Sequence, residues 1–312
     1  MITRMTGASQ HAFTVFTPTF NRRPLLPRLY DSLCRQTFRD FEWLVIDDGS
    51  TDGTAELIRK WAGEAGFPLR YAWQANSGKH AAINRAVAMA SGYHFLIQDS
   101  DDWFAPTALE RIQAHWDQIP SGHRMRYTGI VGLFAAPDGS IVDGRFPRAV
   151  MDADAIELAA RYGFTGDKFG SNRTEVLREF PFPQVAASYV CESLVWNRIA
   201  QKYTQRCVNE VFAFKEYLKG GLTDQNVPVK VRAWSVNRLY YQECVGIPRS
   251  LPIGWRLRKC VNYVRFSMHG KVTLRQQAVD IPRRLFWILS LPLGYLLYRR
   301  DRARLPGEIR NQ

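Results

Sequence analysis

The sequence predicts an α/β fold, in which a mostly parallel sheet is flanked by helices and followed by a C-terminal helical extension that is basic and apolar. Strand-like and helix-like segments alternate four times between residues 13 and 97, which is typical of βαβ units around a parallel sheet. A polar motif follows each of the four strand-like runs, where ligands of such sheets bind. The charge balance then changes near residue 227, where the extension begins.

Short runs of β-branched and aromatic residues predict the strands, and amphipathic segments with start signals predict the helices. The four N-terminal strands are predicted over 13–17, 41–46, 69–73 and 93–97. The helices between them are predicted over 23–36, 52–61 and 79–90. Further along, the pattern predicts a helix over 106–118, a hairpin joining 129–135 to 141–142, helices over 154–161 and 192–200, and a strand over 208–214.

The composition fits a globular protein of 312 residues, enough for roughly two domains of ~150 residues. Residues 1–11 are polar, so no secretory signal is expected, and no run reaches the ~18 apolar residues of a simple membrane-spanning helix. Five scattered cysteines lack the Cys-x-x-Cys spacing of zinc and redox sites. Reduced thiols and a cytoplasmic location are therefore expected.

The net charge of +13 is unevenly distributed. Residues 1–227 hold 25 Lys and Arg against 25 Asp and Glu, whereas 228–312 hold 17 against 4. This asymmetry predicts a neutral first domain, residues 1–227, joined to a basic helical region, residues 228–312. Such a region is expected to meet an anionic surface, either a membrane or a nucleic acid.

Three carboxylates lie within four positions after the fourth strand, at Asp99, Asp101 and Asp102. Carboxylates this close repel one another unless a cation lies among them, and oxygen ligands suit hard cations such as Mg²⁺ or Mn²⁺. A metal site is one interpretation of this motif. A solvated acidic turn that caps the next helix is the other.

Four polar motifs follow the four strands in order. They are Thr17-Pro18-Thr19-Phe20-Asn21-Arg22, Asp47-Asp48-Gly49-Ser50-Thr51-Asp52, Asn76-Ser77-Gly78-Lys79 and Asp99-Ser100-Asp101-Asp102. Together they resemble glycosyltransferase family 2, the inverting transferases with the Rossmann-like GT-A fold, over about residues 12–220. The conjunction of the four motifs is specific, whereas any one alone is common.

The resemblance implies a nucleotide-sugar site at these strand ends. The residues that it implies for the nucleotide are Thr17, Pro18, Asn21, Asp48, Asn76, Gly78, Lys79 and Asp99. In this interpretation Asp48 accepts a hydrogen bond from the uracil imide, which needs an acceptor; the alternative is that Asp47 and Asp48 only cap the following helix.

The loop before the third helix and the acidic motif complete the implied site. Gly78 lets the backbone approach a ligand, and Lys79 offsets phosphate charge. Asp99 and Asp101 match the metal-binding Asp-x-Asp pattern, with Asp102 beside them, and the implied cofactor is Mn²⁺ or Mg²⁺. His80 is either a partly buried helix residue or a substrate contact, and Asn84 lies on the same helix face.

An inverting transferase also needs a base that takes the proton from the attacking hydroxyl. Family members commonly carry this base in a Glu-Asp pair at the start of a later helix. Here the corresponding segment has Glu192 without a following Asp. Glu192 is the first candidate, although it also fits a structural carboxylate at a helix N-terminus, and Asp167 is the second. Lys215, Tyr217 and the glycine turn at 220–223 fit either a loop that closes over the diphosphate or a plain surface turn.

The C-terminal region carries a nearly apolar run, residues 285–298, with Pro292 in the middle and arginines on both sides. It is too short to span ~30 Å of hydrocarbon as a helix, so an interfacial or re-entrant segment on an anionic membrane is expected. The alternative is a buried hairpin that packs on the catalytic domain or on a second subunit in a homo-oligomer. Nucleic acid is not an expected partner, because it does not account for the apolar run.

These observations predict a metal-dependent inverting glycosyltransferase of hexosyl or N-acetylhexosaminyl type. It is expected to move a sugar from a nucleotide-sugar, a UDP-sugar first, to a hydroxyl of a polysaccharide or lipid-linked acceptor at the inner face of the cell membrane. Two alternatives stay open. A non-catalytic nucleotide- or lipid-binding scaffold subunit would explain the missing carboxylate after Glu192. A nucleotidyltransferase would share the acidic site, although residues 17–22 lack its phosphate-loop glycines.

Overall fold

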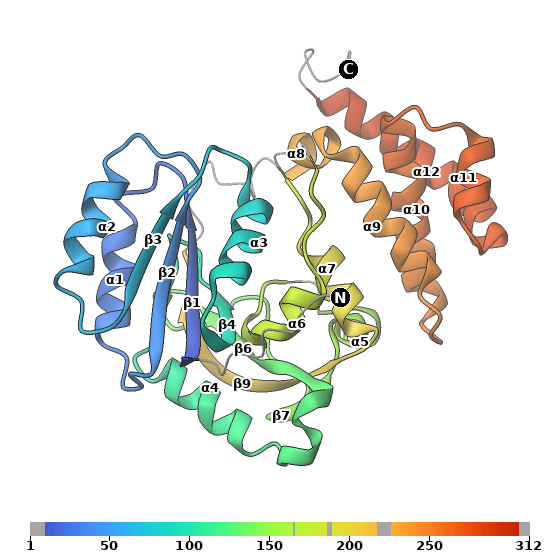
Figure 1. Cartoon of the computed structure of the whole chain (residues 1–312). Coiled ribbons are helices and arrows are strands. Elements are labelled where there is room, and N and C mark those ends of the chain that lie inside the picture. The colour runs from blue at the N-terminus through green and yellow to red at the C-terminus, as the bar shows by residue number, and fades with distance from the viewer. Residues whose placement is uncertain (1–9, 165, 186–188, 217–225, 306–312) are drawn as a thin grey trace, which may run out of the picture. The chain divides into compact units, whose positions relative to one another are not determined.

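The computed structural model describes residues 10–164, 166–185, 189–216 and 226–305, and it divides into two compact units (Figure 1). The first, called the sheet unit here, comprises residues up to 155 together with 164–182 and 198–216. The second, called the helical unit, comprises 156–163, 183–197 and the residues from 217 onward.

The sheet unit contains one mixed sheet with the strand order β3-β2-β1-β4-β8-β6-β9-β5, and β7 pairs with β9. Its strands are β1 His11–Thr19, β2 Phe41–Asp47, β3 Leu69–Trp73, β4 Gly92–Ile97, β5 Trp103–Phe104, β6 Tyr127–Ala135, β7 Val150–Ala153, β8 Phe169–Arg173 and β9 Thr204–Phe214. The first four strands are parallel to one another. The predicted sheet with a parallel core flanked by helices is confirmed.

Helices connect the parallel strands and cover both faces of the sheet. In Figure 1, α1 (Leu26–Cys34) and α2 (Thr54–Ala62) lie on one side of β1 and β2, and α3 (Lys79–Met89) lies on the other. The other helices of the sheet unit are α4 Ala108–Asp117 and α6 Thr174–Glu179, with a 3₁₀ helix at Ser121–Arg126. Nearly all of α5 (Ala155–Arg161) and most of α7 (Ser193–Ala200) belong to the helical unit. This arrangement brings the carboxyl ends of β1 to β4 to one edge.

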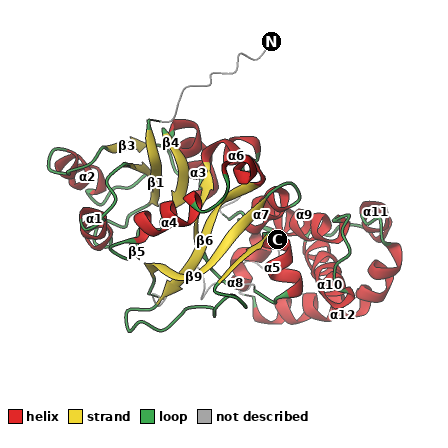
Figure 2. Ribbon diagram, turned by 90° about the horizontal axis from the view of Figure 1, so that it is seen from below, coloured by secondary structure: helices red, strands yellow, loops and turns green. Residues whose placement is uncertain are grey.

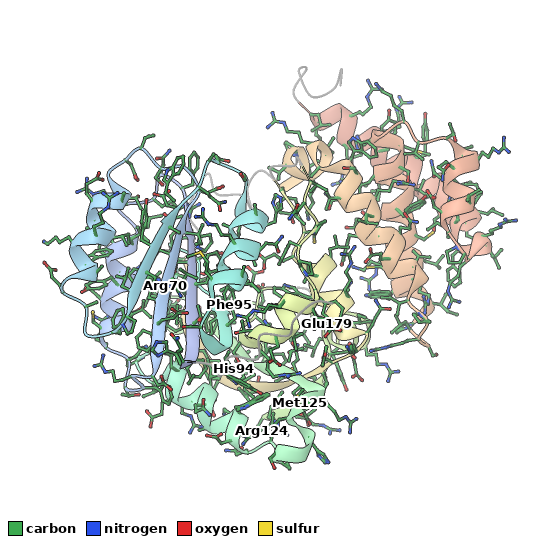
Figure 3. All side chains as sticks on the ribbon, in the orientation of Figure 1. Arg70, His94, Phe95, Arg124, Met125 and Glu179 are labelled. Atoms are coloured by element: carbon green, nitrogen blue, oxygen red, sulfur yellow. The ribbon has the colours of Figure 1, made fainter. Side chains whose placement is uncertain are left out.

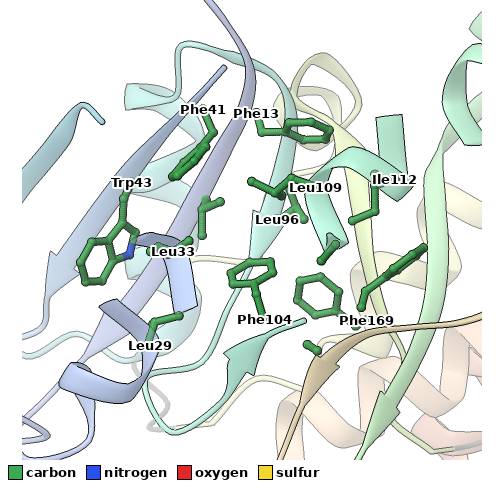
Figure 4. Packing of buried hydrophobic residues seen from close by; sticks show 14 of the residues in the cluster. Phe13, Leu29, Leu33, Phe41, Trp43, Leu96, Phe104, Leu109, Ile112 and Phe169 are labelled. Carbon is green, nitrogen blue, oxygen red and sulfur yellow. The ribbon is translucent and has the colours of Figure 1, made fainter. Parts of the chain in front are cut away.

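The core beneath that edge is aromatic and fully buried. Leu29 and Leu33 of α1 pack toward Phe41 and Trp43 of β2, as Figure 4 shows. Each large apolar side chain contributes roughly 1.5–3 kcal/mol when it is removed from water. The indole Nε1–H of Trp43 also donates to the Thr17 hydroxyl over 3.0 Å. Packing in this core and the Trp43–Thr17 hydrogen bond therefore hold β1 and β2 together.

A buried carboxylate fixes the opposite, amino-terminal ends of the strands. Glu42 accepts hydrogen bonds from the Thr14 hydroxyl at 2.6 Å, from the Ser91 N–H at 2.8 Å and from Arg70, which is labelled in Figure 3, at 2.9 Å. Burial alone would raise the pKa of Glu42, but these donors outweigh it and lower the pKa. A one-residue slip of β2 would break all three contacts, so Glu42 helps to set the register that aligns the functional edge.

The part of the helical unit that is described over residues 226–305 contains five consecutive helices. They are α8 Asn226–Arg232, α9 Trp234–Gly246, α10 Ile253–His269, α11 Leu274–Asp280 and α12 Arg284–Arg304. Helix α10 packs between α9 and α12, and Tyr263 and Val264 lie in the shared core. At Gly294 the two helices approach so closely that a Cβ there would lie 2.5 Å from Val264 Cγ1. The predicted C-terminal helical region is therefore a packed helical bundle.

The apolar run 285–298 forms part of one continuous helix, α12, with Pro292 inside it. It is not a re-entrant segment. Arg265 and His269 of α10 hold the buried Asp301 of α12, at 2.6 Å and 3.0 Å. Within the described residues, no helix combines the length and the apolar character needed to cross a membrane.

The predicted hairpin at 129–142 forms only in part. A turn follows Ala135, Ile141 makes an antiparallel bridge to Ala135, and the Val142 N–H donates to the Phe134 carbonyl over 3.0 Å, but residues 141–142 do not form a strand. Strand β6 pairs with β8 and with the long strand β9, and β9 lies beside β6 in Figure 2. Gly139 adopts the turn with φ of +84°, so the local signal was real, but long-range pairing with β9 decided the sheet.

Candidate nucleotide and metal site

The loops after β1 and β2 are linked through Asn21. Its φ is +52°, a left-handed conformation that asparagine adopts more readily than most residues. The Asn21 N–H donates to the Ser50 hydroxyl, and the Asn21 side-chain oxygen accepts from the Thr51 N–H, both at 2.8 Å. Asn21 is exposed and positions both loops at the edge where the resemblance implies a nucleotide.

Thr17 and Pro18 lie in β1 rather than in the loop. The Thr17 side chain is fully buried and accepts from Trp43, so it stabilises the edge from inside. Pro18 is half-buried and lies opposite Ile46 of β2. The whole of Thr17 is 0% exposed, so the structure does not bring it to the surface of the candidate site.

Asp48 organises the loop between β3 and α3. Its carboxylate accepts from Gln74 Nε2, from the Ser77 N–H and from the Gly78 N–H, each at 2.8 Å. A carboxylate has about four lone-pair positions, and donors among the described residues occupy three. One position on Oδ2 is left for a further donor, which fits an imide N–H. Asp47 is different, because the Ser50 N–H and the Tyr71 hydroxyl hold its buried carboxylate.

The backbone of this loop suits close approach by a ligand. Gly78 has φ of +89° and precedes α3, a conformation that side chains rarely allow. Gly49 has φ of +98°, and a Cβ there would lie 3.2 Å from the Asn76 nitrogen. Asn76 itself is exposed. The predicted loop residues Asn76, Gly78 and Lys79 therefore border the same edge as Asp48.

Asp99, Asp101 and Asp102 form a compact cluster after β4. One carboxylate oxygen from each lies within 4.8 Å of the others. Asp102 is 4% exposed, and its burial, reinforced by the Asp99 charge, raises its pKa to about 8. Two half-buried carboxylates beside a buried third make an all-oxygen donor set of the kind that Mn²⁺ and Mg²⁺ prefer. The residues present fit such a cation.

Two basic side chains pair with the outer carboxylates of the cluster. The Lys79 ammonium lies 2.7 Å from Asp99 Oδ1, and Arg22 Nη1 lies 2.7 Å from Asp101 Oδ2. Loss of water around Asp99 would raise its pKa, but the charge and hydrogen bond of Lys79 outweigh it and lower the pKa. Sequence reasoning proposed Lys79 for phosphate but missed the role of Arg22, whose signal was its place directly after Asn21.

Arg28 is a further residue that sequence reasoning missed. Its guanidinium lies 3.6 Å from the centre of the Trp103 ring and donates to the Asp101 carbonyl over 2.8 Å. Trp103 in turn stacks on Phe214 of β9. Arg28 therefore stabilises the loop that carries the acidic cluster, through its contacts with the Asp101 carbonyl and the Trp103 ring. Its position on the N-terminal turns of α1 carried no local signal for this contact.

Lys215 lies at the end of β9 and pairs with Asp167 over 2.6 Å. Burial lowers the pKa of Lys215, but the charges of Asp167, Asp102 and Asp99 outweigh it and raise the pKa. The Lys215 ammonium therefore interacts electrostatically with both Asp167 and the acidic cluster. Tyr217 and the turn at 220–223 lie outside the described residues.

The remaining predicted residues have clear structural settings. Glu192 is half-buried directly before α7, where its carbonyl accepts from the Val195 and Trp196 N–H groups; it belongs to the helical unit. His80 is buried in α3. Asn84 exchanges two hydrogen bonds of 2.9 Å with the Phe182 backbone, which is a structural role.

Comparison with known proteins identifies a family to which this chain is similar in sequence. The Glycosyl transferase family 2 model matches residues 14–173, just over half of the chain. Glycosyltransferase GlyA of Streptococcus pneumoniae is 30% identical over 125 residues, which cover 39% of this chain and 18% of that protein. The PGL/p-HBAD biosynthesis glycosyltransferase of Mycobacterium bovis is 37% identical over 103 residues, which cover 33% of this chain and 40% of that protein. The matches thus span less than half the length of these relatives.

Solved structures show the same fold. Staphylococcus aureus TarS 1–349 in complex with UDP-GlcNAc has a TM-score of 0.62 at 20% identity, covering 96% of this chain and 85% of that one. The mannosyltransferase PcManGT from Pyrobaculum calidifontis, in complex with GDP-Man and Mn²⁺, has a TM-score of 0.55 at 20% identity, covering 97% and 83%. With its GT-A fold and its family match through β8, this chain belongs to glycosyltransferase family 2.

Proposed function

We propose that this chain is a metal-dependent inverting glycosyltransferase that uses a UDP-sugar, with catalysis in residues 1–227. The observation that carries the proposal is the Asp99, Asp101 and Asp102 cluster, which lies at the same sheet edge as the loops organised by Asn21 and Asp48. A carboxylate cluster, an acceptor for an imide and nearby cations for phosphate are the parts that nucleotide-sugar binding needs.

The proposed roles combine the contacts of these residues with the family resemblance. Asp48 orients the nucleobase and Lys79 meets the diphosphate, while Asp99 and Asp101 hold Mn²⁺ or Mg²⁺. When bound, the cation would stabilise negative charge on the departing diphosphate. Glu192 accepts the proton of the attacking hydroxyl. Asp167, whose carboxylate pairs with Lys215 at 2.6 Å, is the second candidate for this base.

UDP-GlcNAc is the donor to test first, because it is bound in the similar TarS structure. We propose a glycan or a lipid-linked sugar as acceptor. Calorimetric titration of UDP, GDP and dTDP into the full chain, with and without Mn²⁺, tests the donor class. We expect UDP to bind more tightly in the presence of Mn²⁺. If none of the three binds in either condition, the catalytic proposal fails and a scaffold role takes its place.

Helix α12 supports a further part of the proposal, a position at the inner face of the cell membrane. Its outward face is apolar and exposed, with exposed fractions of 51% to 67%. The residues of this face are Leu285, Ile288, Leu289, Leu293 and Leu296. Their spacing places them on one side of the helix, whereas Ser290, Gly294 and Asp301 lie on the buried side.

The charges beside this face favour an anionic lipid surface as its partner. Exposed arginines lie at both ends of the run, Arg283 and Arg284 before it and Arg299 and Arg300 after it. The acidic residue of the helix, Asp301, is buried against Arg265 and His269. An apolar helix face between cationic ends is typical of helices that lie in the membrane interface, and each basic residue adds about 1 kcal/mol on anionic lipid.

Vesicle sedimentation tests this surface. We expect the protein to bind vesicles that contain phosphatidylglycerol, and to bind at least ~10-fold more weakly after Leu289→Gln with Leu293→Gln, because apolar burial in the interface is lost. Leu274→Gln with Val279→Gln is the matched control, since both side chains are exposed on α11. If the wild-type protein forms dimers through α12 and does not bind vesicles, the membrane assignment is contradicted. The partner of this face is then a second copy of the chain.

A further inference from the structure

We propose that Lys79 and Arg22 are exchangeable counter-ions of the acidic cluster. In the free protein they neutralise Asp99 and Asp101, and when a divalent cation and a nucleoside diphosphate bind together, both basic groups transfer to the diphosphate. The inference rests on the proposed function, because it assigns a coupling device to the same site.

The ion pairs occupy the oxygens that a cation would need. Lys79 contacts both oxygens of Asp99, at 2.7 Å and 3.0 Å, and Arg22 contacts Asp101 Oδ2 at 2.7 Å. The side chains are accessible, at 37% exposed for Lys79 and 37% for Arg22. Both side chains therefore already reach solvent, so their charged groups can leave the carboxylates without unpacking the core.

Each basic group starts from a backbone position at the sheet edge where the proposed function places the diphosphate. Lys79 is the first residue of α3, directly after the left-handed Gly78, and helix N-termini favour anions. Arg22 follows Asn21, which links the first two loops. A diphosphate at this edge would meet two ready cationic partners, whereas a metal alone would only displace them into water.

Charge balance then couples the two ligands. A divalent cation bound alone must compete with two positive groups for the same carboxylates, so the groups oppose its binding. A diphosphate bound alone meets cations that the carboxylates already hold. When both ligands bind, the cation takes the carboxylates that Lys79 and Arg22 leave, and the diphosphate takes the two basic groups that the cation displaces. The coupling is reciprocal, so the metal raises nucleotide affinity by the same factor as the nucleotide raises metal affinity.

Binding of Mn²⁺ alone to the full-length protein tests the exchange without any turnover. We expect Lys79→Gln and Arg22→Gln each to tighten Mn²⁺ binding by about tenfold, within the range typical of coupled sites. UDP affinity in the presence of Mn²⁺ should fall in the same variants, so the factor by which Mn²⁺ improves UDP binding shrinks. Lys60→Gln is the charge-matched control, since Lys60 is exposed on α2.

The outcomes separate this inference from the proposed function. Mn²⁺ affinity equal to wild type in both Lys79→Gln and Arg22→Gln overturns the exchange, even if the enzyme transfers sugar. Tighter Mn²⁺ binding in the variants, with no nucleotide binding by any form, supports competition for the carboxylates and rejects the nucleotide role. Absence of Mn²⁺ binding in wild type and in both variants overturns the exchange as well. Thermal melting of each variant shows that it is folded before titration.

Discussion

Asp101→Asn is expected to lower the rate of sugar transfer by about 100- to 1000-fold, the loss typical when one electrostatic stabiliser is removed from an active site. Asp101 contributes one of the three carboxylate oxygens that lie within 4.8 Å of one another. An amide has the same shape, but it is neutral and binds hard cations less strongly. The change also removes the ion-pair partner of Arg22. Metal-dependent UDP binding should therefore disappear together with transfer.

Two measurements check this result. Calorimetric titration of UDP with and without Mn²⁺ reports binding, and UDP release from UDP-GlcNAc in the presence of a cell-envelope glycan extract reports transfer. Asp31→Asn is the matched control, because Asp31 is an exposed carboxylate on α1. If Asp101→Asn keeps the full effect of Mn²⁺ on UDP affinity, Asp101 is not a metal ligand.

The functional edge could be predicted from sequence because its geometry follows from local patterns. The strands β1 to β4 are short and separated by helices, so their polar ends had to meet at one edge. The pattern could not show which way Thr17 points. Strand β1 is buried on both faces. When neither face of a strand is polar, the alternation of polar and apolar residues cannot show on which face a given side chain lies. The Trp43 indole, from the next strand, decides the orientation of the Thr17 side chain.

Contacts between distant segments were beyond the sequence patterns. Arg22 and Asp101 lie 79 residues apart, and their ion pair depends on the β1–β4 register. The sequence also could not predict which face of α12 is exposed, because residues 285–298 are apolar on nearly every side of the helix. Packing on α10 selects the face that carries Ser290 and Gly294. Small residues were the available signal, since they permit close helix approach.

Glu192→Gln is expected to lower transfer by about 100- to 10,000-fold, the usual contribution of a general base, while UDP binding stays unchanged. The amide keeps the size of the side chain but cannot take a proton from the acceptor hydroxyl. The effect should appear in kcat rather than in the donor affinity, because the base acts only as the new bond forms.

Asp167→Asn is the informative companion, because Asp167 is the other candidate base and lies in an ion pair with Lys215. UDP release from UDP-GlcNAc measures kcat for both variants, and calorimetry measures their UDP affinity. If Glu192 is the base, Glu192→Gln loses transfer, whereas Asp167→Asn changes mainly the setting of Lys215 beside the acidic cluster. A fully active Glu192→Gln variant together with an inactive Asp167→Asn variant would reverse the assignment. Since Asp167 is 63% exposed, its loss should leave the fold intact and the comparison direct.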